Sequence, residues 1–238
     1  MGLKQGWYVL KESFKTGYEY IGMVMLANLL WFGIGFAPLL IVTFIPIENA
    51  WYVLAGFVGT AFTLGGATAA VHFMMNKLID RDDTTIKDFW IGFKKFFGRG
   101  SGLVLLGALG FVILFADLMF SISNPNKIIR LLSGIWVWGM LYWYAVLQFV
   151  FPFLTQQDKG LITVLKRAAL VSIDNVLGSI IVVVISILII ILSLVLAAPI
   201  LLFTMSLLAL VQNYALNEIM LKYEKLEADR KETEEVEQ

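Results

Sequence analysis

Uncharged stretches longer than a membrane is thick dominate the pattern of hydrophobic and polar positions along the chain. No Asp, Glu, Lys or Arg occurs at residues 20–47, 49–76, 131–157 or 175–217, and residues 100–123 are interrupted only by Asp117. A helix of about 20 apolar residues crosses the hydrocarbon core of a bilayer. Helices buried in a soluble core keep a polar stripe, which these stretches lack. The pattern therefore predicts an all-α, polytopic membrane helical bundle.

Six transmembrane spans fit these stretches, at about residues 20–45, 51–76, 101–123, 130–154, 175–197 and 199–217. The last two share one uncharged stretch, and a turn near Pro199 is expected between them. A proline can also kink one long helix whose neighbours satisfy the freed backbone groups, which would leave five spans. In either case residues 1–221 form a single bundle domain, and residues 222–238 form a charged tail that continues the last helix.

The distribution of Lys and Arg favours six spans with both termini in the cytoplasm. Cytoplasmic loops of membrane proteins carry an excess of these residues. With six spans, all of the 18 Lys and Arg residues except Lys127 and Arg130 lie on one side of the membrane. Five spans would place the basic residues of the tail on the other side.

Composition removes several classes of protein. Apolar residues make up 59% of the chain and charged residues 15%, and the formal net charge is zero, so nothing electrostatic favours nucleic acid as a partner. The absence of Cys excludes disulfides and thiolate metal sites. The first apolar stretch lacks a convincing small-residue cleavage site, so we expect a retained span rather than a signal peptide.

Two amphipathic segments are predicted on the cytoplasmic side. Apolar residues recur at helical spacing near the N-terminus, at Leu3, Trp7, Leu10, Phe14 and Tyr18. They recur again in TIKDFWIGFKKFFGRG, where Thr85 and Asp88 have the spacing of a capping box. Both segments suit helices that lie in the headgroup layer. The second is also a candidate partner-docking helix, through Phe89, Trp90, Phe93 and Lys94.

Polar residues inside the spans are candidate functional residues, because an ionisable group in hydrocarbon is costly unless it is paired or hydrated. Five helices would carry polar side chains at a similar depth. The set is Asn28, His72, Asn76, Gln148, Asp174, Asn175, Gln212 and Asn213. Together they would line a cavity open to the cytoplasm, or they would only hydrogen-bond between helices and hold the bundle together.

Asp117 and Arg130 are expected near the outer ends of neighbouring spans, where they would form an ion pair. A structural role for this pair competes with a gate or a coupling site for an ion or proton.

Small residues three and four apart form a stripe along the second span, at Gly56, Gly59, Thr63, Gly66 and Ala70. Small residues let helix backbones approach closely in lipid, where the hydrophobic effect between helices is absent. We therefore expect this span to be central, although the stripe could equally serve a homodimer.

No motif supports an enzyme. A single His without Cys makes no triad, and neither metal-ligand spacing nor a phosphate-binding or dinucleotide fingerprint is present. The sequence therefore implies neither catalytic residues nor a cofactor.

Four segments carry a family resemblance. NLLW at residues 28–31, TLGGATAAV at 63–71, NKL at 76–78 and FWIGFKKFF at 89–97 resemble the YesL-like family of bacterial membrane proteins, a domain of unknown function. The resemblance implies a multi-pass protein of the bacterial plasma membrane that is associated with carbohydrate uptake. It carries over no catalytic residue.

Two functional hypotheses follow. The first is a non-catalytic accessory or structural component that works with a sugar-uptake permease or a cytoplasmic protein. The alternative is a self-sufficient small transporter or channel with a polar inner cavity around His72 and Asp174.

Overall fold

The computed structural model describes residues 1–44 and 50–236, and the elements found there are α-helices. The helices that form the long walls of the bundle are α4, α5, α7, α9 and α11. The bounds in chain order are α1 Leu3–Glu19, α2 Ile21–Gly35, α3 Ala37–Phe44, α4 Ala50–Ile79, α5 Ile86–Ser123, α6 Lys127–Leu131, α7 Ser133–Gln157, α8 Leu161–Asp174, α9 Val176–Leu196, α10 Ala198–Leu202 and α11 Thr204–Val236. The predicted all-α class is confirmed for the described residues.

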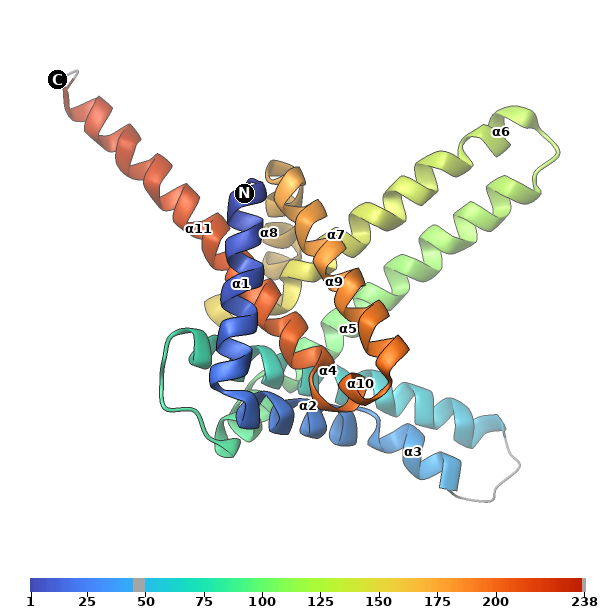
Figure 1. Ribbon diagram of the computed structural model, residues 1–238. Coiled ribbons are helices and arrows are strands. Elements are labelled where there is room, and N and C mark those ends of the chain that lie inside the picture. The colour runs from blue at the N-terminus through green and yellow to red at the C-terminus, as the bar shows by residue number, and fades with distance from the viewer. Residues whose placement is uncertain (45–49, 237–238) are drawn as a thin grey trace.

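The helices cross in the middle of the molecule and extend from there as separate arms (Figure 1). Figure 1 shows α3 beside the first part of α4, α5 beside α7 with α6 at their tip, and α9 joined through α10 to α11. We call the side of the molecule away from the tips of these helix pairs, from which the tail of α11 projects, the charged end. Ion pairs gather there, including Arg81 with Glu19 at 3.1 Å and Lys95 with Asp158 at 2.9 Å.

Four helices are long and apolar enough to cross a membrane: α4, α5, α7 together with α6, and α9. The bent pair α2 and α3 would be a fifth. The predicted span at 199–217 is not among them, because α10 breaks the segment and the part of α11 before Glu218 is short for a full crossing. A membrane helical bundle is therefore shown, whereas six spans stay a prediction.

The first predicted span is broken into α2 and α3, which differ in direction by 54°. Side chains of α4 bond to backbone groups that the break frees. Thr63 Oγ1 donates to the carbonyl oxygen of Gly35 at 2.7 Å, and the backbone N–H of Leu39 donates to Thr60 Oγ1 at 3.2 Å. Such bonds allow a helix break at membrane depth, where water is absent.

The predicted interfacial helix at 85–97 and the span at 101–123 are one continuous helix, α5. The predicted capping box at its start is confirmed, since the Thr85 N–H donates to Asp88 Oδ2 at 2.7 Å. No break separates the two segments, because Gly98 and Gly100 are accommodated within the helix. The buried side chains of Phe89 and Phe96 hold its first turns against the core.

Helix α1 turns its small residues and Val9 toward the bundle, and its large apolar residues away from it. Gly6 and Gly17 are buried, and a Cβ at Gly6 would lie 2.7 Å from the side chain of Ile181 on α9. Trp7 and Tyr18 are 69% and 80% exposed. The apolar face is therefore free to lie among lipid, as expected for an interfacial helix.

Residues 175–217 form two long helices, α9 and α11, rather than one kinked helix. The chain turns at Ala197, whose φ is 56°, and Pro199 lies in the first turn of α10, where its missing N–H is harmless. Helix α11 continues without a break into the charged tail.

Candidate functional site

The only His of the chain lies in a buried polar cluster between α4, α7 and α11. Asn213 Nδ2 lies 3.3 Å from His72 Nδ1, and Gln156 Nε2 donates to Asn213 Oδ1 at 3.1 Å. Because an amide nitrogen only donates, Nδ1 accepts, and the proton of the neutral ring is on Nε2. That Nε2 is buried and bonds to no described residue. The ring stacks on Phe151 at 5.6 Å between centroids.

A second buried cluster joins α7, α9 and α11 around Gln148. Its Oε1 accepts from Ser186 Oγ at 2.9 Å and from Gln212 Nε2 at 2.7 Å. Gln212 and Asn213 are neighbours on α11, so this helix contributes to both clusters. The amide groups thus bond to one another, which satisfies them away from water.

Asn28 is tied to backbone instead of to these clusters. Its Nδ2 donates to the carbonyl oxygens of Ile200 and Leu201 at 2.9 and 2.7 Å, and its Oδ1 accepts from the N–H of Met205 at 2.7 Å. One fully buried amide therefore fastens α2 to the turn between α9 and α11.

Asp174 and Asn175 lie at the charged end, apart from His72. Tyr223 Oη donates to Asp174 Oδ2, and Asn175 Nδ2 donates to Tyr223 Oη at 2.6 Å. The amino group of Met1 and Lys222 Nζ both donate to Asn175 Oδ1 at 3.4 Å. The N-terminus, the α8–α9 junction and α11 therefore meet at one polar cluster.

The polar cavity predicted from the sequence divides into separate sites. His72 with Asn213, Gln148 with Gln212, and Asn28 each bond in a different place, and Asn76 Nδ2 donates to Asp80 Oδ2 at 3.2 Å. Of the eight residues, Asp174 lines an open pocket that the structure shows at the charged end.

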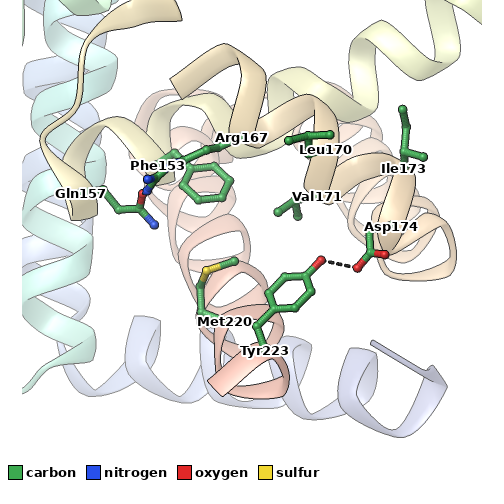
Figure 2. A pocket seen from close by; sticks show the side chains of 9 residues that line it. All are labelled: Phe153, Gln157, Arg167, Leu170, Val171, Ile173, Asp174, Met220 and Tyr223. Atoms are coloured by element: carbon green, nitrogen blue, oxygen red, sulfur yellow. Dashed lines mark hydrogen bonds between the residues drawn. The ribbon is translucent and has the colours of Figure 1, made fainter. Parts of the chain in front are cut away.

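That pocket lies between α7, α8 and α11 and has a volume of about 610 Å³ (Figure 2). Its middle is apolar and is formed by Phe153, Leu170, Val171, Ile173 and Met220. Polar groups stand at its two ends. Arg167 bonds to Gln157 at one end, and Tyr223 bonds to Asp174 at the other. The pocket is therefore apolar inside with a cationic end and an anionic end.

Burial, then the hydrogen bond to Asp174 and its negative charge, raise the pKa of Tyr223 to about 12. Tyr223 therefore stays protonated near neutral pH and remains a donor to Asp174.

Helix α8, which carries half of this pocket, lies between the fourth and fifth predicted spans. Its buried face recurs at helical spacing, at Val164, Ala168, Val171 and Ser172. This periodicity indicates an amphipathic helix. The signal is weak beside the longer and more apolar stretches on either side of it.

Asp117 and Arg130 are not paired within the described residues. Arg130 Nη2 donates to the carbonyl oxygen of Asn124 at 3.3 Å. The contact between α5 and α7 near this end is made by Trp136 Nε1, which donates to Ser121 Oγ at 2.9 Å.

The predicted docking helix faces two ways. Phe89 is fully buried and Phe93 lies against Gly66 of α4, so these rings belong to the fold. Trp90 is 43% exposed, and Lys94 is exposed one turn further on. Of the four predicted residues, Trp90 and Lys94 are accessible to a partner.

The small-residue stripe of α4 serves two interfaces. Gly56 and Gly59 lie against Val42 and Pro38 of α3, whereas Gly66 lies against Phe93 and Phe97 of α5. Thr63 bonds to α2 and Ala70 is buried near Gly92. All five residues are used within the chain, which favours packing over a homodimer for this stripe.

Within residues 1–44 and 50–236, no three His, Cys, Asp or Glu side chains come together as a metal site would require.

Comparison with known proteins finds one family match. The family described as "Protein of unknown function, DUF624" matches residues 47–118. The α4–α5 pair is similar to this family. The match covers less than half of the chain, and it includes the Gly-rich contact between the two helices. No curated protein and no solved structure matches the chain.

Proposed function

We propose that this protein is a YesL-like, non-catalytic accessory component of the bacterial plasma membrane, with six spans and both termini in the cytoplasm, that assists carbohydrate uptake. The observation that supports it most is that the amide side chains within the predicted spans are hydrogen-bonded inside the protein. Asn28, Gln148 and Asn213 bond to other groups of the chain, so they act as interhelical fasteners. The open polar features lie at the charged end, where a partner can reach them.

The exposed pair Trp90 and Lys94 is the proposed contact for the partner. Trp is enriched at protein interfaces, and the charge of Lys94 beside it would attract an acidic group of the partner. Both residues lie near the start of α5, close to the ion pairs that Lys95 and Arg99 make with Asp158. These pairs fix the helix relative to the α7–α8 connection.

Affinity purification from native membranes tests the proposal. The double variant Trp90→Ala, Lys94→Ala is compared with Lys127→Ala, Ile128→Ala, which removes an exposed basic and apolar pair at α6. We expect permease subunits to co-purify with the native protein and the α6 variant, and growth on oligosaccharides to fall only in the α5 variant. If the native protein retains no permease component, or both variants retain it equally, the proposal fails.

One observation favours the alternative, a small transporter or channel: the buried Nε2 of His72 lacks a partner. An unsatisfied donor at membrane depth is costly and is often functional. In sealed vesicles, the purified protein would then move a sugar, ion or proton faster than empty vesicles do, and His72→Ala would abolish the flux while Asn124→Ala would not. Equal flux in protein-containing and empty vesicles removes this alternative.

A further inference from the structure

A groove of about 450 Å³ lies between α7, α8 and α9, next to the pocket of Figure 2. Its walls include Trp138 and Ala145 from α7, Ile173 from α8, and Ile180 and Val183 from α9. Its size is in the range of ligand pockets, about 300–1,000 Å³. The groove is therefore large enough for part of a small molecule.

The surface around the groove is exposed and apolar. Ile173, Val176 and Ile180 are 60%, 56% and 52% exposed, and Trp138 is 73% exposed. In a membrane helical bundle such an apolar surface faces the lipid acyl chains, because the bilayer core contains no water. The groove is thus open to the acyl chains of the bilayer.

One buried polar atom in the groove is unsatisfied. Ser172 lines the groove, is 3% exposed, and its Oγ has no hydrogen-bond partner in the structure. A buried hydroxyl normally has one. A ligand with a carbonyl oxygen near the apolar part would provide an acceptor.

Ile173 lines both the groove and the pocket of Figure 2, so the two hollows share a wall. The pocket holds Arg167 two turns back along α8, and a guanidinium has five donors, of which Gln157 uses one. At the other end of the pocket Tyr223 donates to Asp174, and the amino group of Met1 and Lys222 Nζ both donate to Asn175 Oδ1 beside it, where the negative charge of Glu218 also acts on the Met1 amino group. The negative charge of Asp174 is thus engaged at one end, and Arg167 at the other end offers donors to an anionic group.

We propose that this double hollow binds an anionic phospholipid. The phosphate bonds to Arg167 in the pocket, and one acyl chain passes over Ile173 into the groove between α7, α8 and α9. An ester carbonyl of the lipid accepts the hydrogen bond of Ser172. The site needs only that the bundle is embedded in a bilayer and is independent of whether a partner protein binds.

Photo-crosslinking of the full-length protein in vesicles tests the site. The vesicles contain phosphatidylcholine and phosphatidylglycerol, with a trace of either lipid carrying a photoreactive group in its acyl chain, and the labelled residues are mapped by mass spectrometry. We expect the phosphatidylglycerol probe to label residues 138–145 and 172–183 above equally exposed sites such as Leu188 and Leu194. The phosphatidylcholine probe should label them less.

Two variants separate the parts of the site, each with a matched control. Ala145→Trp fills the groove and should abolish the enrichment, whereas Val184→Trp, on an exposed position of α9 outside the groove, should not. Arg167→Gln should lower the preference for phosphatidylglycerol about fivefold, the value of one basic residue near a membrane surface, whereas Arg230→Gln in the tail should not. Arg167 is exposed, so its variant folds even if Ala145→Trp does not. Labelling that only follows exposure, or equal labelling by the two probes, overturns the proposal.

Discussion

Gly65 of α4 and Gly100 of α5 lie backbone to backbone. A Cβ built at Gly65 would come 2.5 Å from the carbonyl carbon of Gly100, closer than any real side chain approaches a backbone. Next to this contact, Ser101 Oγ donates to the carbonyl oxygen of Phe62 at 2.7 Å. The contact lies within the region that matches the family of unknown function. It sets how closely the two central helices approach.

Gly65→Ala should destabilise the protein, because the methyl group can fit only if α4 and α5 move apart. Overpacking of this kind costs about 1–3 kcal/mol. The control is Gly98→Ala on the same helix as Gly100, where a Cβ meets nothing within 4 Å and alanine favours the helix. Thermal unfolding of the purified protein in detergent measures both, and similar unfolding temperatures for the two variants would contradict the close contact.

Asn28→Leu should weaken the attachment of α2 to the α9–α11 turn. The change leaves the carbonyl oxygens of Ile200 and Leu201 without their donor, and an unsatisfied buried group costs about 1–3 kcal/mol. Asn124→Ala, in an exposed loop, should change the free energy of unfolding by less than about 0.5 kcal/mol. Faster proteolysis near residue 203 in Asn28→Leu but not in Asn124→Ala would locate the effect, and equal proteolysis would count against it.

Asp158 should make stability depend on pH in the acid range. Hydrogen bonds from Lys95 and Arg99 lower its pKa below the usual 3.8. A folded-state pKa below that of the unfolded chain gives stability that is present above about pH 4 and is lost as the pH falls through the folded-state value. Asp158→Asn should therefore lower stability at pH 7, by less than about 1 kcal/mol because the pair is partly exposed, and the difference from the native protein should shrink as the pH falls below about 4. A difference that is constant with pH would contradict the ion pairs.

The six-span topology can be tested on a chain that contains no Cys. Single substitutions Asn126→Cys and Leu196→Cys should react with an impermeant maleimide added to intact cells. Asp83→Cys and Asp229→Cys should react only after the membrane is opened, because the basic residues around them stay in the cytoplasm. Labelling of Asp229→Cys in intact cells would show that α11 does not return to the cytoplasmic side.

The sequence predicted the candidate site residues better than it predicted their grouping. The polar residues of the spans were identified, and the structure places all eight in hydrogen bonds that join elements or neighbouring residues. The sequence did not show that His72 and Asp174 belong to different clusters, because the grouping depends on how each helix is tilted and which way its side chains point. The sequence did not indicate the pocket at Arg167 for a related reason: its walls come from α7, α8 and α11, and the sequence does not show that these helices pack together.

The sequence by itself determined that much of this chain is apolar enough to lie in lipid, that its elements are helices, and where several of them begin. Hydrophobic length and the Thr85–Asp88 cap are local properties, so they can be seen without neighbours. Only the tertiary structure decided the break between α2 and α3, the continuity of α5 and the contact of Gly65 with Gly100. Each of these depends on close packing and hydrogen bonds between segments far apart in the sequence, and in lipid such contacts, rather than the burial of apolar surface, hold the helices together.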